Sequence, residues 1–184
     1  MVGLGKTYIA AMLGKLLDGR KLFIVPPVVK DNWEGVLSDF GYKMSDKVVS
    51  LGIVDQLSKT DDIASYKYVF IDEAHRFRNA SSTEFQYLKK ICYGKGVILI
   101  TATPQNNTIL DIANLITLFQ DSRNSSIIPG NHNLEKYFNE LYKEVKVSKN
   151  DPIVVSNIAA EIRDNVLRHV LIRRTRSEIT QYYK

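Results

Sequence analysis

Cysteine is nearly absent from this sequence: Cys92 is the single one among 184 residues, so no disulfide can form within the chain. Such usage suits a reducing compartment. Long apolar runs are missing too, because residues 22–29 and 97–100 fall far short of the roughly 20 residues that cross a bilayer. The residues after Met1 lack the charged and then apolar layout of a secretory signal. We therefore expect an intracellular protein without a membrane partner, cytoplasmic in a bacterium or nuclear in a eukaryote.

Charge and composition narrow the class of protein but leave its partner open. Hydrophobic residues make up 45% and charged residues 24%, as in ordinary globular proteins, and the length fits one domain with a core of its own. The 25 Lys and Arg exceed the 20 Asp and Glu, for a net charge of +5. A mildly basic balance favours a polyanionic partner, but composition alone does not identify one.

Short apolar strands alternate with helices in the first two thirds of the chain. The predicted helices are residues 6–17, 31–40, 83–92 and 109–119, and the predicted strands are residues 22–25, 48–51, 69–71 and 97–100. In the first helix the apolar positions are Ile9, Met12, Leu13 and Leu16. Continuously apolar strands are buried on both faces, and helices between strands indicate parallel crossover units. The sequence therefore predicts an α/β fold, a three-layer parallel sheet with helices on both faces.

The composition of the sequence changes after residue 120. Residues 121–133 are rich in Ser, Asn, Gly and Pro and predict a long loop, and residues 133–145 predict an amphipathic helix. A last helix is predicted from the helical spacing of Val155, Ile158, Ala159, Ile162 and Val166. We therefore divide the chain into a core at residues 1–120 and a loop and helical extension at residues 121–184.

The first candidate site is Gly3-Leu4-Gly5-Lys6-Thr7, at the start of the first predicted helix. The first N–H groups of a helix have no internal partner and its dipole is positive there, so this position suits a phosphate. Gly3 and Gly5 let the backbone approach phosphate oxygens, Lys6 would reach the β- and γ-phosphates of ATP, and Thr7 would ligate Mg²⁺. The five residues alone also fit a glycine turn that caps a helix.

The second candidate site is Asp72-Glu73, directly after the apolar strand at residues 69–71. Ligands of open parallel sheets bind at the carboxyl ends of the strands. Asp72 would hold Mg²⁺ there, and Glu73 would polarise the attacking water. In isolation the pair could be a helix N-cap. Together with a Gly-Lys-Thr loop in the correct order, it indicates phosphoryl transfer.

Five motifs in this order resemble the Swi/Snf-type branch of the superfamily-two helicase-like ATPases, over nearly the whole chain. They are Gly3-Leu4-Gly5-Lys6-Thr7, Ile24-Val25-Pro26-Pro27 with Asn32-Trp33, Ile71-Asp72-Glu73-Ala74-His75-Arg76-Phe77-Arg78-Asn79, Thr101-Ala102-Thr103-Pro104-Gln105-Asn106-Asn107 and Leu171-Ile172-Arg173-Arg174-Thr175-Arg176. The second motif and the Gln-Asn-Asn tail favour this branch over RNA helicases. One residue that the family commonly has between Pro104 and Gln105 is missing here.

The resemblance implies a RecA-like P-loop NTPase lobe and a role for each matched residue. Catalysis would rest on Glu73 and Lys6, and Gly3, Gly5, Lys6 and Thr7 would bind the nucleotide. Thr7 and Asp72 would hold the metal. His75, Thr101, Thr103 and Gln105 would couple the nucleotide state to DNA grip and lobe closure. Arg173 and Arg174 would contact DNA, although a solvated face or an interface with a second lobe explains them equally well.

By the same resemblance the chain is the first lobe of a DNA-dependent ATPase, a translocase on double-stranded DNA that uses ATP and Mg²⁺. The second RecA-like lobe, which would complete the cleft, lies outside this chain. We therefore expect feeble ATP binding and negligible hydrolysis from residues 1–184 alone. The alternatives are the motor lobe of a restriction-type translocase, an RNA helicase, or a non-catalytic nucleotide-binding module.

Overall fold

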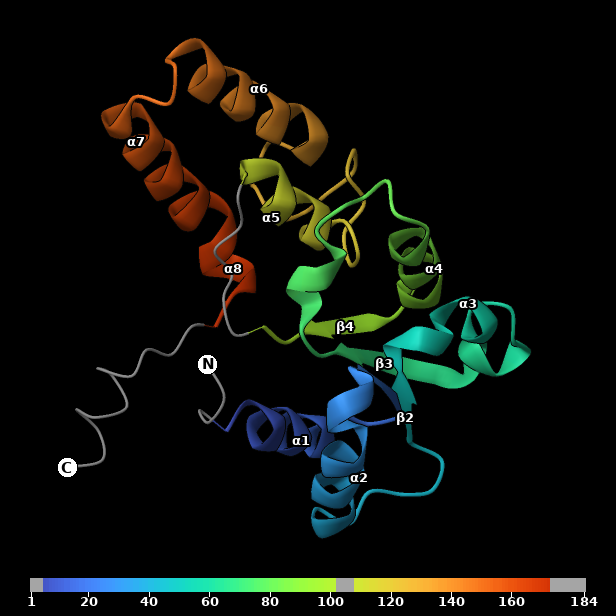
Figure 1. Cartoon of the computed structure of the whole chain (residues 1–184). Coiled ribbons are helices and arrows are strands. Elements are labelled where there is room, and N and C mark those ends of the chain that lie inside the picture. The colour runs from blue at the N-terminus through green and yellow to red at the C-terminus, as the bar shows by residue number, and fades with distance from the viewer. Residues whose placement is uncertain (1–4, 102–107, 173–184) are drawn as a thin grey trace, which may run out of the picture. The chain divides into compact units, whose positions relative to one another are not determined.

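The computed structural model describes residues 5–101 and 108–172 (Figure 1). The chain divides into two compact units, Met1–Phe119 and Gln120–Lys184. The first unit contains every strand of the sheet, and the regular structure of the second is helical. None of the helices among the described residues is long and apolar enough to cross a membrane.

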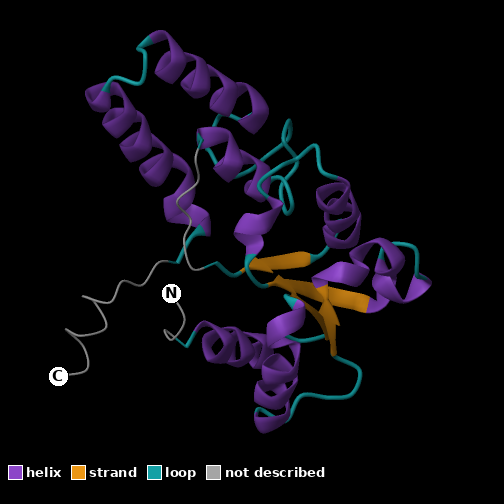
Figure 2. Cartoon of the chain, in the orientation of Figure 1, coloured by secondary structure: helices purple, strands orange, loops and turns teal. Residues whose placement is uncertain are grey.

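The first unit is built on a four-stranded sheet with the strand order β2-β1-β3-β4 (Figure 2). All three neighbouring pairs are parallel. The elements in chain order are α1 (Lys6–Leu16), β1 (Arg20–Val25), α2 (Lys30–Asp39), β2 (Lys47–Ser50), α3 (Val54–Leu57), β3 (Tyr66–Ile71), α4 (Thr83–Cys92), β4 (Gly96–Leu99) and α5 (Ile109–Ile116). The predicted α/β fold with a parallel sheet is confirmed. Helix α3 is a single turn, too short to show a helical period, and the sequence did not predict it.

Alternate residues of each strand feed two separate cores. Leu22 and Ile24 of β1 face the core that α3 and α4 cover, whereas Phe23 and Val25 face the core that α1 and α2 cover. Figure 1 shows these two helix pairs on opposite sides of the sheet. Both faces of the sheet are therefore buried, which is why the strands are continuous apolar runs in the sequence. Burial among apolar side chains also raises the pKa of the Cys92 thiol to about 12.

Helix α1 packs differently from its apolar pattern. Ile9, Met12, Leu13 and Leu16 are exposed, and Ala10, Ala11 and Gly14 are buried instead. The small residues let α1 approach the sheet closely: a side chain at Gly14 would collide with the Tyr42 hydroxyl, which donates a hydrogen bond to the Ala11 carbonyl at 2.7 Å. Helical periodicity locates an apolar stripe, but close packing on large aromatic rings decided which face of α1 is buried.

The second unit contains α6 (Leu134–Val147), α7 (Pro152–Ile162) and α8 (Arg168–Val170), with a π-helical turn at Arg163–Leu167 between the last two. Two polar caps begin the long helices: Asn133 accepts from the Lys136 amide, and Asp151 accepts from the amides of Ile153 and Val154. Ile158, Ile162 and Val166 are buried, but Val155 and Ala159 of the predicted apolar face are exposed.

Candidate functional site

The described part of the candidate site lies where β3 and β4 end and α1 begins. Asp72 and Glu73 follow β3, and Thr101 follows β4 by two residues. Two backbone bonds continue the sheet past the strand ends: the Asp72 amide donates to the Ile24 carbonyl at 2.9 Å, and the Ile100 amide donates to the Ile71 carbonyl at 2.8 Å. Rigid sheet backbone therefore fixes the position of the two carboxylates.

Asp72 is held by two hydrogen bonds in a buried setting. Asp72 is only 8% exposed. The Trp33 indole Nε1 donates to Oδ2 at 3.0 Å, and the Glu73 amide donates to Oδ1 at 2.9 Å. Each carboxylate oxygen has a second lone pair, so both can still accept another ligand. The two hydrogen bonds orient the Asp72 carboxylate and leave both of its oxygens able to accept another ligand.

Trp33 is the functional residue that the sequence reasoning missed. Its ring is 1% exposed and packs on Phe23, with the ring centroids 5.5 Å apart. The sequence placed it in a family motif and assigned it no contact with the acidic strand end. The available signal was chemical: a buried indole N–H requires an acceptor, and a carboxylate at a strand end is one.

Glu73 occupies a backbone conformation that non-glycine residues rarely adopt. Its φ is 51° and its ψ is 42°, in the left-handed region. The next residue is fixed by a bond from the Ala74 amide to the Ile100 carbonyl at 3.0 Å. Such strained residues gather at functional sites, where the surrounding structure holds them in place. The Glu73 side chain contacts Lys6 at the start of α1.

Lys6 is the first residue of α1 and forms an ion pair with Glu73, with 3.7 Å between Nζ and Oε1. The N-cap of the helix is Gly5, whose φ of 65° favours glycine. Because Glu73 adjoins Asp72, this pair places Lys6 at the same edge of the sheet as both carboxylates. Thr7 follows in the first turn and is partly buried.

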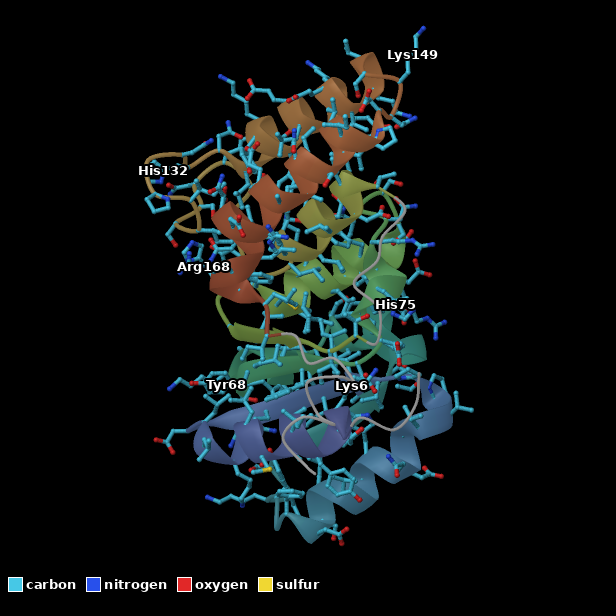
Figure 3. All side chains as sticks on the ribbon, turned by 90° about the vertical axis from the view of Figure 1, so that its left-hand side faces the viewer. Lys6, Tyr68, His75, His132, Lys149 and Arg168 are labelled. Carbon is cyan, nitrogen blue, oxygen red and sulfur yellow. The ribbon has the colours of Figure 1, made fainter. Side chains whose placement is uncertain are left out.

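His75 connects Glu73 to the end of β4. Its Nδ1 lies 3.2 Å from Glu73 Oε2 and 3.2 Å from Thr101 Oγ1. Lys6 and His75, labelled in Figure 3, are thus linked through a single carboxylate. Four side chains from three segments, Lys6, Glu73, His75 and Thr101, form one polar network.

The oxygen donors of this site fit Mg²⁺. The structure describes two carboxylates here, Asp72 and Glu73, and two hydroxyls, Thr7 and Thr101. The described residues hold no cluster of three His, Cys, Asp or Glu side chains that could bind a metal ion. Mg²⁺ keeps several waters and binds through one or two carboxylates together with substrate phosphates, so it needs no larger protein cage. One lysine also leaves the two carboxylates with a net negative charge, which a cation would balance.

Five of the expected site residues lie outside the residues that the structure describes. They are Gly3, Thr103, Gln105, Arg173 and Arg174. The structure places the other seven at the edge of the sheet where β3 and β4 end: Gly5, Lys6, Thr7, Asp72, Glu73, His75 and Thr101.

We expect Trp33 and Asp72 to be energetically coupled through their hydrogen bond. Trp33→Phe removes the donor and Asp72→Asn removes the charge, so the double variant should be more stable than the sum of the single losses predicts. Hydrogen bonds to charged groups contribute about 1.5–3 kcal/mol, and we expect a coupling of about 1–3 kcal/mol. Chemical denaturation of the four proteins measures it. Strictly additive losses would show that the bond contributes nothing to the free energy of unfolding.

Comparison with known proteins gives a family match and several curated relatives. Residues 41–183 match the family model of the SNF2-related domain. An uncharacterized ATP-dependent helicase of Bacillus subtilis, YqhH, is 28% identical over 167 residues, which are 80% of this chain and 28% of that protein. The ISWI chromatin-remodeling complex ATPase ISW2 of Saccharomyces cerevisiae is 25% identical over 209 residues, which are 97% of this chain and 17% of that protein. The chain thus spans less than a third of the length of either relative.

A solved structure shares the fold. The SWI2/SNF2 ATPase core of Sulfolobus solfataricus, determined in complex with double-stranded DNA, superposes with a TM-score of 0.65 at 23% identity. The similarity covers 97% of this chain and 40% of that one. The family match extends over more than half of the residues and includes the acidic strand end. The chain therefore belongs to the SNF2-related domain family.

Proposed function

We propose that this chain is the first ATPase lobe of a DNA-dependent ATPase that moves along double-stranded DNA. The observation that carries the proposal is the contact between Lys6 and Glu73, because it unites the glycine loop and the acidic strand end in one site. Within the proposal, residues 1–120 form the ATP-binding core and residues 121–184 close the lobe. Action on DNA also implies an intracellular location, cytoplasmic in a bacterium or nuclear in a eukaryote.

Lys6 binds the β- and γ-phosphates of ATP after leaving Glu73. Its pair with Glu73 is long, and the two side chains are 27% and 33% exposed, so the pair is weak and does not lock Lys6 away from a ligand. Gly3 and Gly5 bring the backbone amides at the start of α1 to the phosphates. The positive end of the helix adds to the charge of Lys6.

Asp72 and Thr7 would hold Mg²⁺, which when bound neutralises charge on the phosphates. Trp33 and the Glu73 amide orient the Asp72 carboxylate before any ligand arrives. Glu73, once Lys6 has turned to the phosphates, is free to accept a hydrogen bond from the attacking water. Because the backbone at Glu73 is fixed, its carboxylate needs little reorganisation at that step.

His75 links Glu73 to the segment after β4, so a movement of Glu73 is transmitted to that segment. His75 contacts Glu73 and Thr101 through the same ring nitrogen. A rotation of the Glu73 side chain away from His75 would leave this nitrogen with Thr101 as its contact. Thr101 begins the segment that continues to Thr103 and Gln105. We propose that this segment couples ATP turnover to the grip on DNA, and that Arg173 and Arg174 contact the DNA backbone.

Stimulation by nucleic acid tests the proposal. We expect the full-length protein to hydrolyse ATP faster when duplex DNA is added, and to respond much less to single-stranded RNA. Phosphate release is the measurement, with equal nucleotide concentrations of each polymer. Turnover that ignores nucleic acid altogether would contradict a motor, and stronger stimulation by RNA would favour the RNA helicase alternative.

A further inference from the structure

A side chain of α5 holds the turn that follows the two carboxylates of the candidate site. This turn is the 3-10 segment Ala74–Phe77 with Arg78 as its C-cap, and it contacts α5 (Figure 1). The Asn114 side chain donates from Nδ2 to the Arg78 carbonyl at 2.8 Å, and the two residues are 36 positions apart in the sequence. The last carbonyls of a helical turn have no partner within the turn, and Asn114 provides one of them with a donor.

The same turn is also attached to the end of β4. The Ala74 amide donates to the Ile100 carbonyl at 3.0 Å, and His75 Nδ1 lies 3.2 Å from Thr101 Oγ1. Residues 102–107, which lie outside the described residues, connect this point to α5. The turn after Glu73 therefore holds the chain on both sides of the segment to which the proposed function assigns the coupling.

Both partners of the Asn114 bond belong to well-anchored segments. Phe77 of the turn is 6% exposed, and it lies in the same buried core as Leu118, which follows α5. At the other end of α5, the Thr108 amide donates to Asp111 Oδ2 at 3.3 Å, which is one of the two bonds of a capping box. Since the turn and the helix are each fixed locally, the bond from Asn114 sets the position of α5 relative to Glu73.

Stability of the turn does not by itself require this donor. Arg78 is exposed, so water could satisfy its carbonyl. Gln86 makes a comparable bond nearby, because its Nε2 donates to the Ala80 carbonyl at 2.7 Å. That bond joins α4 to the loop before it and reaches neither β4 nor α5. The two bonds are chemically alike, and what sets the Asn114 bond apart is that it joins α5 to the turn after Glu73.

We propose that Asn114 is a positioning residue for the coupling of ATP turnover to DNA. It acts through the Arg78 carbonyl and holds α5 against the turn that carries His75. Both ends of residues 102–107 then keep a constant position relative to Glu73. Energetic coupling between sites is carried by packed elements and hydrogen bonds of this kind, whereas the chemistry at the phosphates does not depend on Asn114. This role rests on the proposed function, since it presumes a DNA-dependent ATPase.

The response of ATP turnover to duplex DNA tests this role. In the full-length protein we expect Asn114→Ala to change turnover without DNA by less than about twofold and to lower the stimulation by DNA at least about fivefold, the lower end of usual coupling factors. Asn114→Asp keeps the size of the side chain but only accepts hydrogen bonds, so it should behave like Asn114→Ala. Gln86→Ala is the matched control and should keep full stimulation. Phosphate release over a range of duplex concentrations gives both kcat and the half-maximal DNA concentration.

The outcomes separate this role from the proposed motor. Full stimulation in either Asn114 variant, or an equal loss in Gln86→Ala, would overturn the role of the Asn114 bond and leave the motor intact. A fall without DNA as large as the fall with DNA would also overturn it, because Asn114 would then support the fold or the catalytic site. Turnover of the unaltered protein that ignores DNA would refute the motor and this role with it. Thermal melting followed by circular dichroism verifies that the variants fold.

Discussion

Replacing Lys6 with alanine in the full-length protein is expected to lower ATP turnover by at least about 100-fold and to weaken ATP binding. Removal of one preorganised donor from a transition-state oxyanion typically costs a factor of about 10²–10³. Lys6 is the cation at the start of α1, and its current partner is the carboxylate that follows Asp72. Its loss also leaves two carboxylates without a balancing charge, which opposes the arrival of a polyphosphate. Phosphate release and calorimetric titration with ATP measure the two effects.

Lys30→Ala is the matched control. Lys30 also begins a helix, α2, and also pairs with a glutamate, since its Nζ lies 3.2 Å from Glu34 Oε1. That pair belongs to one exposed helix face and contributes only about 0.3–0.5 kcal/mol. We therefore expect Lys30→Ala to retain turnover and affinity. Equal losses in the two variants would mean that Lys6 supports the fold and not the phosphate.

Glu73→Gln is expected to separate hydrolysis from binding. Loss of a general base typically lowers the rate by about 10²–10⁴-fold, and we expect a drop in turnover in that range. ATP affinity should stay the same or rise, because glutamine releases Lys6 from its ion pair at 3.7 Å and makes it available to the phosphates. Single-turnover hydrolysis and ATP titration of the full-length protein test the two halves of this expectation.

The control for this change is Glu34→Gln, which also removes a lysine partner, in this case Lys30 on the exposed face of α2. It should alter neither turnover nor affinity. Normal turnover in Glu73→Gln would exclude the carboxylate from the reaction. A loss of affinity as large as in Lys6→Ala would show instead that Glu73 holds the site together in its empty state.

The sequence located the elements of the site because those elements have local causes. The apolar run that ends at Ile71 predicts a buried strand, and its carboxyl end must be where Asp72 and Glu73 emerge. Glycine before Lys6 marks a helix start, and α1 begins there. Parallel order then brings the ends of β3 and β4 to one edge, so the approach of Glu73 and His75 to Thr101 follows from sheet topology.

Other parts of the site could not be read from local pattern. The bond from Trp33 to Asp72 joins residues 39 positions apart, and it depends on how far α2 lies from the end of β3. The left-handed backbone of Glu73 has no sequence signature, because glutamate has no preference for it. The apolar pattern of α1 even indicated the wrong buried face, since it takes no account of how closely Gly14 and the alanines can approach Phe70.

By itself the sequence determined the α/β class, the strand positions and the residues at the strand ends, because period and apolar content act within a few neighbouring residues. Tertiary structure alone decided which residues meet: Lys6 with Glu73, Trp33 with Asp72, and Asn114 with Arg78. These contacts depend on distances between packed elements, which are set by the volumes of the buried side chains and not by any local pattern.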